Sequence, residues 1–502
     1  MPSSSNAQLS EAQAPESYAE LTQEINKQTV KQVQEVLSSV IGTTQLESYN
    51  QDGQGNFPYW LTTGPSGSFN LLTYNWIDQV VMQDADAGAL KNTANAMVGQ
   101  LATVIYPKLS YALNAADQTK LQETQTAAAA QGNALVTQYT QNIAPIPAGT
   151  MNNLNYVAGQ ILTWGPTDKT ITLMDLKNSF DLNAELPNMP AGGSAVLPAL
   201  TLWLNASAST LSLQNSVSFG SAYIAYLNSA VTSPNAATGI ATLDPSNPAA
   251  TPVTKPRWTI TQNANALLNG LKNAGNKVSI SIAASNSSST TTDLSISGGG
   301  GGTFGLDWLT FGVSGSASYN VHTANSSQAS ATVEISYPGV TPVTAQPMPA
   351  QRTGSSAEGW MDQTVLTQAN SNGTALPPQE SGYVFSPALP SALSLGADGN
   401  FGYMNTVAIS DQPTIKITYS GGSSSTYKSV FKQQSNWSVS FLGIFTIAKA
   451  SQSYYKATVE DSASGSGFTV TITPDGDQFN VPDAEKRANV LAAAVTWPGD
   501  AS

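Results

Sequence analysis

The sequence contains no cysteine and a single histidine, His322. Without cysteine there is no disulfide, no thiolate metal site and no cysteine nucleophile. One histidine cannot supply the usual zinc ligands, and no GxSxG motif offers a serine nucleophile. We therefore expect no metal, no cofactor and no catalytic residue of these classes, and we place His322 on an exposed turn or strand.

Charged residues are also scarce, because only 10% of the 502 residues are Asp, Glu, Lys or Arg. Average soluble domains carry roughly 25%. The net charge is −13, and the three arginines, Arg257, Arg352 and Arg487, are far apart in the chain. Phosphate recognition needs clustered Lys and Arg, so we exclude nucleic acid as a partner.

The shortage of charge is uneven along the chain. Residues 201–250 contain only Asp244, and residues 278–333 contain only Asp293 and Asp307. We expect segments of this kind to contact another surface, either membrane lipid or a further copy of the chain.

Long apolar runs are also missing. No window offers about 18 consecutive apolar residues, so we expect no transmembrane helix. Residues 1–20 lack the basic and apolar regions of a secretory signal. We predict a protein that is secreted or released without a recognisable signal peptide, with a cytoplasmic location as the alternative.

The first 150 residues predict helices. Residues 1–15 have the polar composition of a disordered arm, and residues 16–150 form the predicted helical domain. Apolar residues at spacings of three and four predict a helix over 21–41 that ends at Gly42. The same spacing over 90–105, and a second run that ends at 143 and has Asp117 as its predicted N-cap, predict a long helical hairpin broken at Pro107.

The next segment, 151–256, is mixed and ends in a linker. Residues 170–176 predict a strand, whereas the apolar residues of 195–231 follow no fixed period. Residues 232–256 are rich in Pro, Ala and Thr, a composition typical of a linker.

From residue 257 onward the pattern predicts β-structure, in two segments of similar order. The first unit covers 257–345, and the second covers 412–502 and ends in a short helix around 487–491 with Asp483 as its N-cap. Residues 346–411 connect them. Matching segments are KVSISIA with PTIKITY, DLSIS with NWSVS, FGLDWLTFGVSGSASY with FLGIFTIAKASQSYY, and ATVEISYPG with GFTVTITPDG.

The predicted fold class is therefore α+β: an N-terminal helical bundle or hairpin, followed by an antiparallel β-rich part built from a duplicated four-stranded unit. The two units pack face to face as a sandwich, or they pair edge to edge into one larger sheet. Sequence alone leaves both arrangements open.

Acidic residues offer the only conventional catalytic chemistry. Asp84 and Asp86 form one pair, and Asp475, Asp477 and Asp483 form a second group. Two carboxylates serve as acid and base in glycoside hydrolysis. We favour helix capping for the first pair and turn chemistry for the second group, because neither spacing is specific. The five glycines at 298–302 lack a following lysine and predict a flexible joint.

Our leading hypothesis is a non-enzymatic, membrane-active protein of the pore-forming kind that acts as a homo-oligomer. Alternation of apolar with small polar residues is what a β-hairpin needs to face lipid on one side and water on the other. The predicted membrane or partner contacts are the aromatic residues of the two β-segments, with core packing as the competing interpretation. They are Trp308, Phe311, Tyr319, Trp437, Phe441, Phe445, Tyr454 and Tyr455.

Two other functions remain open at this stage. A self-associating structural or adhesive protein would use the charge-poor surface and free sheet edges. A carboxylate-dependent hydrolase acting on polysaccharide would depend on Asp475 or Asp477.

Overall fold

The structure is a computed structural model of the 502-residue chain. It describes residues 18–49, 56–58, 69–84, 88–247, 249–286, 291–299, 301–305, 309–313, 316–320, 330–353, 356–397, 399–421, 424–425, 428, 437–441, 445–448, 455–463, 467–474, 479, 482 and 485–500. The chain forms two compact units. The β-unit comprises 1–104, 229–363 and 390–502, and the helical unit comprises 105–228 and 364–389.

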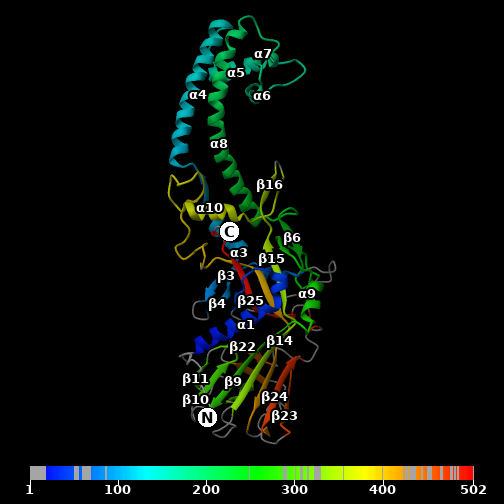
Figure 1. Ribbon diagram of the computed structural model, residues 1–502. Helices are drawn as coiled ribbons and strands as arrows, with labels where there is room; N and C mark the ends of the chain where they lie inside the picture. Colours follow the sequence, from blue (N-terminus) through cyan, green and yellow to red (C-terminus); the bar gives the residue numbers. More distant parts are fainter. Residues whose placement is uncertain are drawn as a thin grey trace, which may run out of the picture. The chain divides into compact units, whose positions relative to one another are not determined.

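The chain has a mixed α+β fold, as the sequence predicts at this level (Figure 1). Helices α4 (Ala115–Asn142) and α8 (Leu197–Thr232) contribute to one apolar cluster. The strands form antiparallel sheets.

A seven-stranded antiparallel sheet forms one part of the β-unit. In spatial order its strands are β11 (Gly301–Gly305), β10 (Thr291–Ile296), β9 (Lys277–Asn286), β14 (Ser330–Pro338), β20 (Thr414–Tyr419), β24 (Phe468–Pro474) and β23 (Tyr455–Asp461). The alternation in KVSISIA is confirmed, because Val278, Ile280 and Ile282 are buried. Strands of the two predicted β-segments meet where β14 pairs with β20, so these segments share one sheet edge to edge.

A six-stranded sheet forms the other part. Strand β25 (Ala488–Thr496) lies between β1 (Glu47–Ser48) and β19 (Tyr403–Ser410), and it also pairs with β2 (Asn56–Phe57). Beyond β19 follow β15 (Thr341–Pro347) and β8 (Trp258–Ile260). The short C-terminal helix predicted around 487–491 is therefore wrong. The run Val490–Ala494 is buried, and a strand buried on both faces has no alternation to distinguish it from a helix.

Two chain segments pass from one sheet directly into the other. Strand β14 continues into β15 through Gly339, and β19 continues into β20. Between them, the Asp411 backbone N–H donates to the Pro338 carbonyl oxygen (3.0 Å). Gly339 has a φ of +65°, and a Cβ there would collide with the backbone carbonyl of Leu271. Only glycine fits this joint without strain.

Helix α1 (Tyr18–Ile41) packs against both sheets (Figure 1). Its stripe of Leu21, Ile25, Val33 and Leu37 is buried in a cluster with apolar residues of β9, β14, β20, β24 and β25. The predicted helix is confirmed here, as is its end at Gly42, which has a φ of +60°.

The predicted helix over 90–105 is largely wrong. The chain instead forms β3 (Gln79–Asp84), β4 (Ala89–Ala96), α3 (Met97–Gln100), a π-helical turn (Leu101–Ile105), a 3-10 turn (Tyr106–Lys108) and β5 (Leu109–Ala112). Residues 92–96, NTANA, are mostly weak helix formers. Pairing of β3 with β4 prevails there over the apolar spacing.

The remaining elements of the β-unit are short. They are α2 (Leu71–Ile77), β6 (Gly239–Thr242), β7 (Val253–Pro256), α9 (Ala264–Leu271), β16 (Gln351–Thr353) and β17 (Ser356–Glu358). Strands β6 and β7 pair as a hairpin inside the stretch predicted as a linker.

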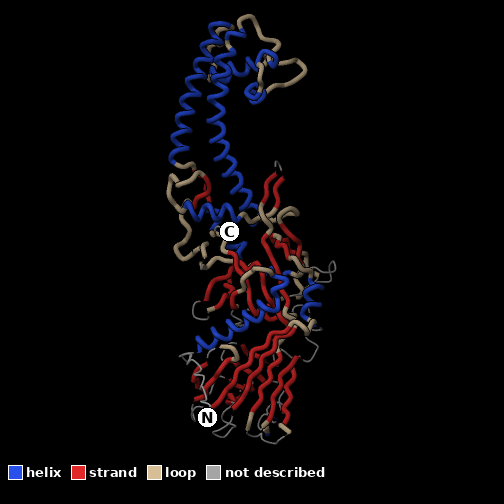
Figure 2. Tube along the Cα trace, viewed as in Figure 1, coloured by secondary structure: helices blue, strands red, loops and turns tan. Residues whose placement is uncertain are grey.

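The helical unit contains the long helices α4 and α8 (Figure 2). The others are α5 (Asn153–Leu162), α6 (Leu173–Asn178), α7 (Leu182–Glu185) and most of α10 (Gln363–Asn372), with a 3-10 turn (Gly193–Ala195), and strand β18 (Gly382–Phe385) pairs with β5. The second helix of the predicted hairpin is confirmed as α4, although its N-cap is Asn114 rather than Asp117. The strand predicted over 170–176 is wrong, because Thr172 and Asp175 form a capping box that begins α6.

Candidate functional site

The candidate site consists of two insertions in the seven-stranded sheet. Strands β9 and β14 are neighbours in space, yet the described residues between them in the chain form four further strands. Strands β20 and β24 are likewise neighbours, with three strands among the described residues between them. Each neighbouring pair is therefore interrupted by an excursion of the chain, and we call these the first and second insertions.

The two insertions join in a separate four-stranded sheet, which we call the paired-hairpin sheet. Its order is β13 (Ser316–Asn320), β12 (Leu309–Val313), β21 (Trp437–Phe441) and β22 (Phe445–Ala448). Strands β12 and β13 belong to the first insertion, and β21 and β22 to the second. The central pairing of β12 with β21 is thus a contact between the two insertions.

The register of the paired-hairpin sheet separates residue types by face. Phe311 is opposite both Tyr319 and Val439, and Phe441 is opposite both Leu309 and Phe445. Directly opposite residues share a face in an antiparallel pair, as do residues two apart in one strand. One face, the apolar face, therefore carries Leu309, Phe311, Val313, Tyr319, Trp437, Val439, Phe441, Phe445 and Ile447. Ser316 is the exception, because it is opposite Val313, where the register of β12 and β13 shifts.

The opposite face, the polar face, carries small residues: Thr310, Gly312, Asn320, Ser438, Ser440, Thr446 and Ala448. None of the four strands contains a charged residue. Moving this sheet from water into lipid would therefore bury no charge, and burying charge is the largest cost of membrane insertion.

Five of the eight predicted contact residues share the apolar face: Phe311, Tyr319, Trp437, Phe441 and Phe445. Trp308 and Tyr454 lie outside the described residues. Tyr455 is 1% exposed in the core of the seven-stranded sheet. Its hydroxyl donates to the Pro413 carbonyl oxygen (3.2 Å) and to Gln412 Oε1 (3.3 Å). Tyr455 therefore packs in the core, which is the alternative to membrane contact that the sequence analysis gave for these aromatic residues.

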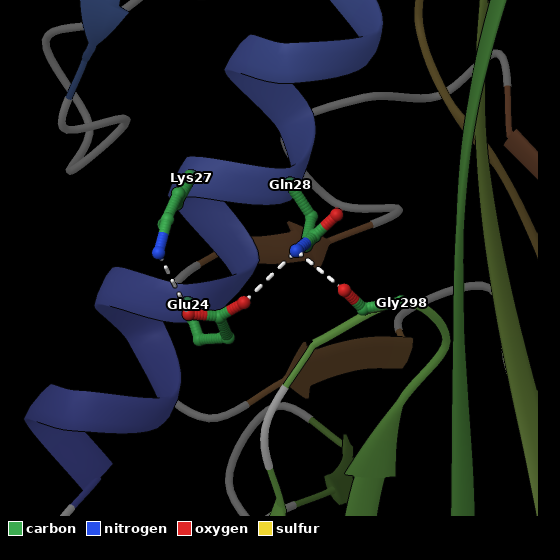
Figure 3. Close-up of polar contacts among 4 residues, drawn as sticks. All are labelled: Glu24, Lys27, Gln28 and Gly298. Carbon is green, nitrogen blue, oxygen red and sulfur yellow. Dashed lines mark hydrogen bonds and ion pairs between the residues drawn. The ribbon is translucent and has the colours of Figure 1, made fainter.

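Helix α1 contacts the first insertion through polar side chains (Figure 3). Gln28 Nε2 donates both to the carbonyl oxygen of Gly298, in the turn between β10 and β11, and to Glu24 Oε1, each at 2.9 Å. Lys27 Nζ lies 3.9 Å from Glu24 Oε2. One turn further along α1, Gln32 Oε1 accepts from the Ser279 backbone N–H of β9 (3.0 Å). We call this set of contacts the α1–turn contact, and sequence periodicity gave no sign of it.

The α1–turn contact is close enough to leave little free space. An ideal Cβ on Gly299 would lie 2.5 Å from Glu24 Oε1 and 3.0 Å from Glu24 Cγ. The exposed hydrogen bonds from Gln28 to Gly298 and from Ser279 to Gln32 contribute roughly 0.5–1.5 kcal/mol each. The buried apolar stripe of α1 therefore supplies most of the attachment, and the polar contacts fix where the turn lies.

Of the acidic groups considered for catalysis, Asp84 alone lies in the described residues. Asp84 pairs with Lys91 (3.0 Å) across β3 and β4, so its predicted role as a helix cap is wrong. Asp86, Asp475, Asp477 and Asp483 lie outside the described residues, as does His322. Where the structure describes the chain, no group of three His, Cys, Asp or Glu side chains could hold a metal ion.

Asp78 is a buried carboxyl group that the sequence did not single out. It is 6% exposed, and its Oδ1 accepts from the Val98 backbone N–H (3.0 Å), while its own carbonyl oxygen accepts from Met97 N–H. Burial raises the pKa of Asp78 to about 7, and the Val98 hydrogen bond and the charge of Lys255 oppose that rise. The folded protein therefore retains a proton here that the unfolded chain releases near pH 4.

This difference predicts a pH-dependent stability. The stabilisation is complete below pH 4 and is lost as pH rises from about 4 to about 7, by about 4 kcal/mol at most. Asp78→Asn keeps an acceptor for Val98 and removes the titration, so the variant should be more stable than the parent at pH 8. Urea unfolding at pH 4.5, 6 and 8 measures this. Asp293→Asn, at an exposed carboxylate, is the control, and equal pH profiles for Asp78→Asn and the parent would contradict the assignment.

Among the described residues, no helix is both long enough and apolar enough to cross a membrane. No protein-family model matches the chain, and neither the curated proteins nor the solved structures contain a significant match.

Proposed function

We propose that the protein is a non-enzymatic, membrane-active protein that forms oligomeric pores, and that the paired-hairpin sheet is the part that enters the lipid. One observation carries the proposal: apart from Ser316 at the register shift in β12 and β13, the register of this sheet places aromatic and aliphatic residues on one face and Ser, Thr, Gly, Ala and Asn on the other. In the pore, the apolar face contacts lipid and the polar face contacts water.

Strand length bears on how insertion proceeds. A strand that crosses a bilayer needs about 9–11 residues, and the longest strands of the paired-hairpin sheet have 5. The hairpins therefore lengthen by recruiting neighbouring sequence from the two insertions. In the first insertion this includes β10 and β11, so the turn at Gly298 leaves helix α1 during the change.

Self-association follows from backbone hydrogen bonding. Every strand in lipid must pair on both sides, because an unpaired backbone group costs several kcal/mol there. Four strands from one chain leave two edges, so further copies must supply the missing partners. We propose a homo-oligomer for this reason, and we propose that it acts outside the cell that makes it.

Duplication of an ancestral unit belongs to the same proposal. The pair β9–β14 and the pair β20–β24 are each interrupted by an insertion that provides one hairpin of the paired-hairpin sheet. Equivalent placement of the two insertions supports a duplicated origin, and so do the sequence matches of β9 with β20 and of β14 with β24. The match of DLSIS with NWSVS does not, because DLSIS lies in β10 of the seven-stranded sheet and NWSVS in β21 of the paired-hairpin sheet.

Dye release from liposomes tests the proposal and its assignment of faces. The parent protein at micromolar concentration should release dye. Val439→Glu, on the apolar face, should slow release by about tenfold, since a charge on the lipid side is destabilising, by roughly 2–4 kcal/mol for Arg or Lys and by less for Glu. Ser440→Glu, the neighbouring residue on the polar face, should retain release. Equal activity of the two variants would contradict the assigned faces, and no release by the parent across several lipid compositions would contradict pore formation.

A structural or adhesive role is the second candidate. Strands β11 and β23 are the edges of the seven-stranded sheet, and each pairs with one neighbour among the described strands. Such edges can add a strand from another copy. Fibres or large assemblies formed without lipid, together with no dye release, would favour this role.

A further inference from the structure

Two adjoining grooves lie on either side of α6 in the helical unit. One, of about 360 Å³, runs between α6 and α8, and we call it the apolar groove. The other, of about 490 Å³, lies between the α6–α7 segment and the first turns of α8, and we call it the polar groove. Lys177 and Leu204 line both grooves.

The apolar groove leaves large apolar side chains in contact with water. It is lined by Leu173, Met174, Trp203, Ala208 and Leu211. Met174 is 52% exposed and Leu211 is 46% exposed, although both adjoin a packed core. A ligand that covers them gains hydrophobic free energy in proportion to the area removed from water. At about 30 Å³ for a group the size of one liquid water molecule, the groove of about 360 Å³ has room for an alkyl chain on the order of ten carbons.

The polar groove offers hydrogen-bonding groups beside the apolar one. Ser194 and Asn205 contribute a hydroxyl and an amide. Its carboxylate, Asp181, already accepts from the Asn183 backbone N–H at the start of α7 (2.9 Å). The arrangement fits a ligand with a small hydrated head at one end of an apolar chain.

The ammonium group of Lys177 indicates the charge that the head group of the ligand should carry. It is exposed in the last turn of α6 and forms no ion pair within the part of the chain that the structure describes. The nearest acid in sequence, Asp175, accepts from Thr172 N–H and Oγ1, and these bonds lower its pKa. An ammonium group at the junction of an apolar and a polar groove is complementary to an anionic head.

We propose that the helical unit binds a single-chain anionic amphiphile, with its alkyl chain in the apolar groove and its carboxylate or phosphate beside Lys177. A free fatty acid and a lysophospholipid share this chemistry. The inference is independent of pore formation, because the grooves lie in a different unit from the paired-hairpin sheet.

Calorimetric titration of the full chain with laurate below its micelle concentration tests the site, and dodecanol serves as the uncharged analogue. Lys177→Gln should weaken laurate binding by about tenfold and leave dodecanol binding unchanged. Ala208→Trp, which fills the apolar groove, should abolish binding of both. The matched controls are Lys169→Gln on the same unit and Ala129→Trp on an exposed face of α4, and both should bind as the parent does.

A parallel titration with lauroyl lysophosphatidylglycerol separates the two sources, since tighter binding of that probe identifies a phosphate head and tighter binding of laurate a carboxylate. The proposal is overturned if laurate and the lysolipid both fail to bind at millimolar concentration. It is also overturned if Ala208→Trp binds them normally, or if only intact vesicles bind. If the protein releases dye but does not bind laurate or the lysolipid, the amphiphile site is contradicted and the proposal of pore formation is unaffected.

Discussion

The double variant Glu24→Cys with Gly299→Cys is expected to release no dye while oxidised, and to regain release when reduced. An ideal Cβ on residue 299 lies 3.0 Å from Glu24 Cγ, which is one bond from the Cβ of residue 24. This places the two Cβ atoms within reach of the 3.5–4.5 Å that a disulfide needs. Because the chain has no other cysteine, no competing pair can form.

The reason for the expected loss is that the disulfide holds the β10–β11 turn on α1. If the first insertion must leave α1 before its strands lengthen, the locked protein stays in its present state. Each single-cysteine variant is a control and should behave as the parent in both redox conditions. Normal release by the fully oxidised double variant would show that insertion does not require this separation.

Gly339→Ala is expected to lower the free energy of unfolding by about 3 kcal/mol or more. A left-handed backbone costs a non-glycine residue roughly 1–2 kcal/mol, and forcing a group into packed space typically costs a further 1–3 kcal/mol. Both costs apply at Gly339, because its φ is +65° and the new Cβ would collide with the fixed Leu271 carbonyl. Urea unfolding at constant pH measures the change.

Gly42→Ala is the matched control for this loss. Gly42 has a φ of +60°, but a Cβ there would have no neighbour within 4 Å. It should therefore show the backbone cost alone, roughly 1–2 kcal/mol. Equal destabilisation by the two variants would mean that the Leu271 carbonyl yields readily and that the joint between the sheets is soft.

Sequence patterns predicted the elements whose burial is one-sided. Helix α1 and strands such as β9 expose one face and bury the other, so periods of 3.6 and 2 are visible in the sequence. Strand β25 is largely buried and α8 has apolar residues around much of its circumference, so neither shows a clear period. Residues 89–96 fit helical spacing, yet their pairing with β3 decides the outcome.

The candidate site was predictable in residue type but not in assembly. The aromatic residues of the two β-segments were predicted as membrane or partner contacts, and five of them share one face. Nothing in either segment indicates that β12 pairs with β21, because register between distant strands depends on the whole fold. The bond between Gln28 and Gly298 is equally invisible, since it joins a helix to a turn far along the chain.

The central place of β25 in its sheet bears on how a newly synthesised chain folds. Glu47 pairs with Ala493, so the six-stranded sheet cannot be completed on the ribosome until residues 488–496 have emerged. Leu491, Ala492 and Ala494 also complete the cluster in which α1 packs. Contacts between such distant segments form slowly. The nascent chain would therefore present both uncharged hairpins before α1 has a finished surface to dock on, which makes the interval before residues 488–496 emerge a period of exposure to aggregation or chaperone binding.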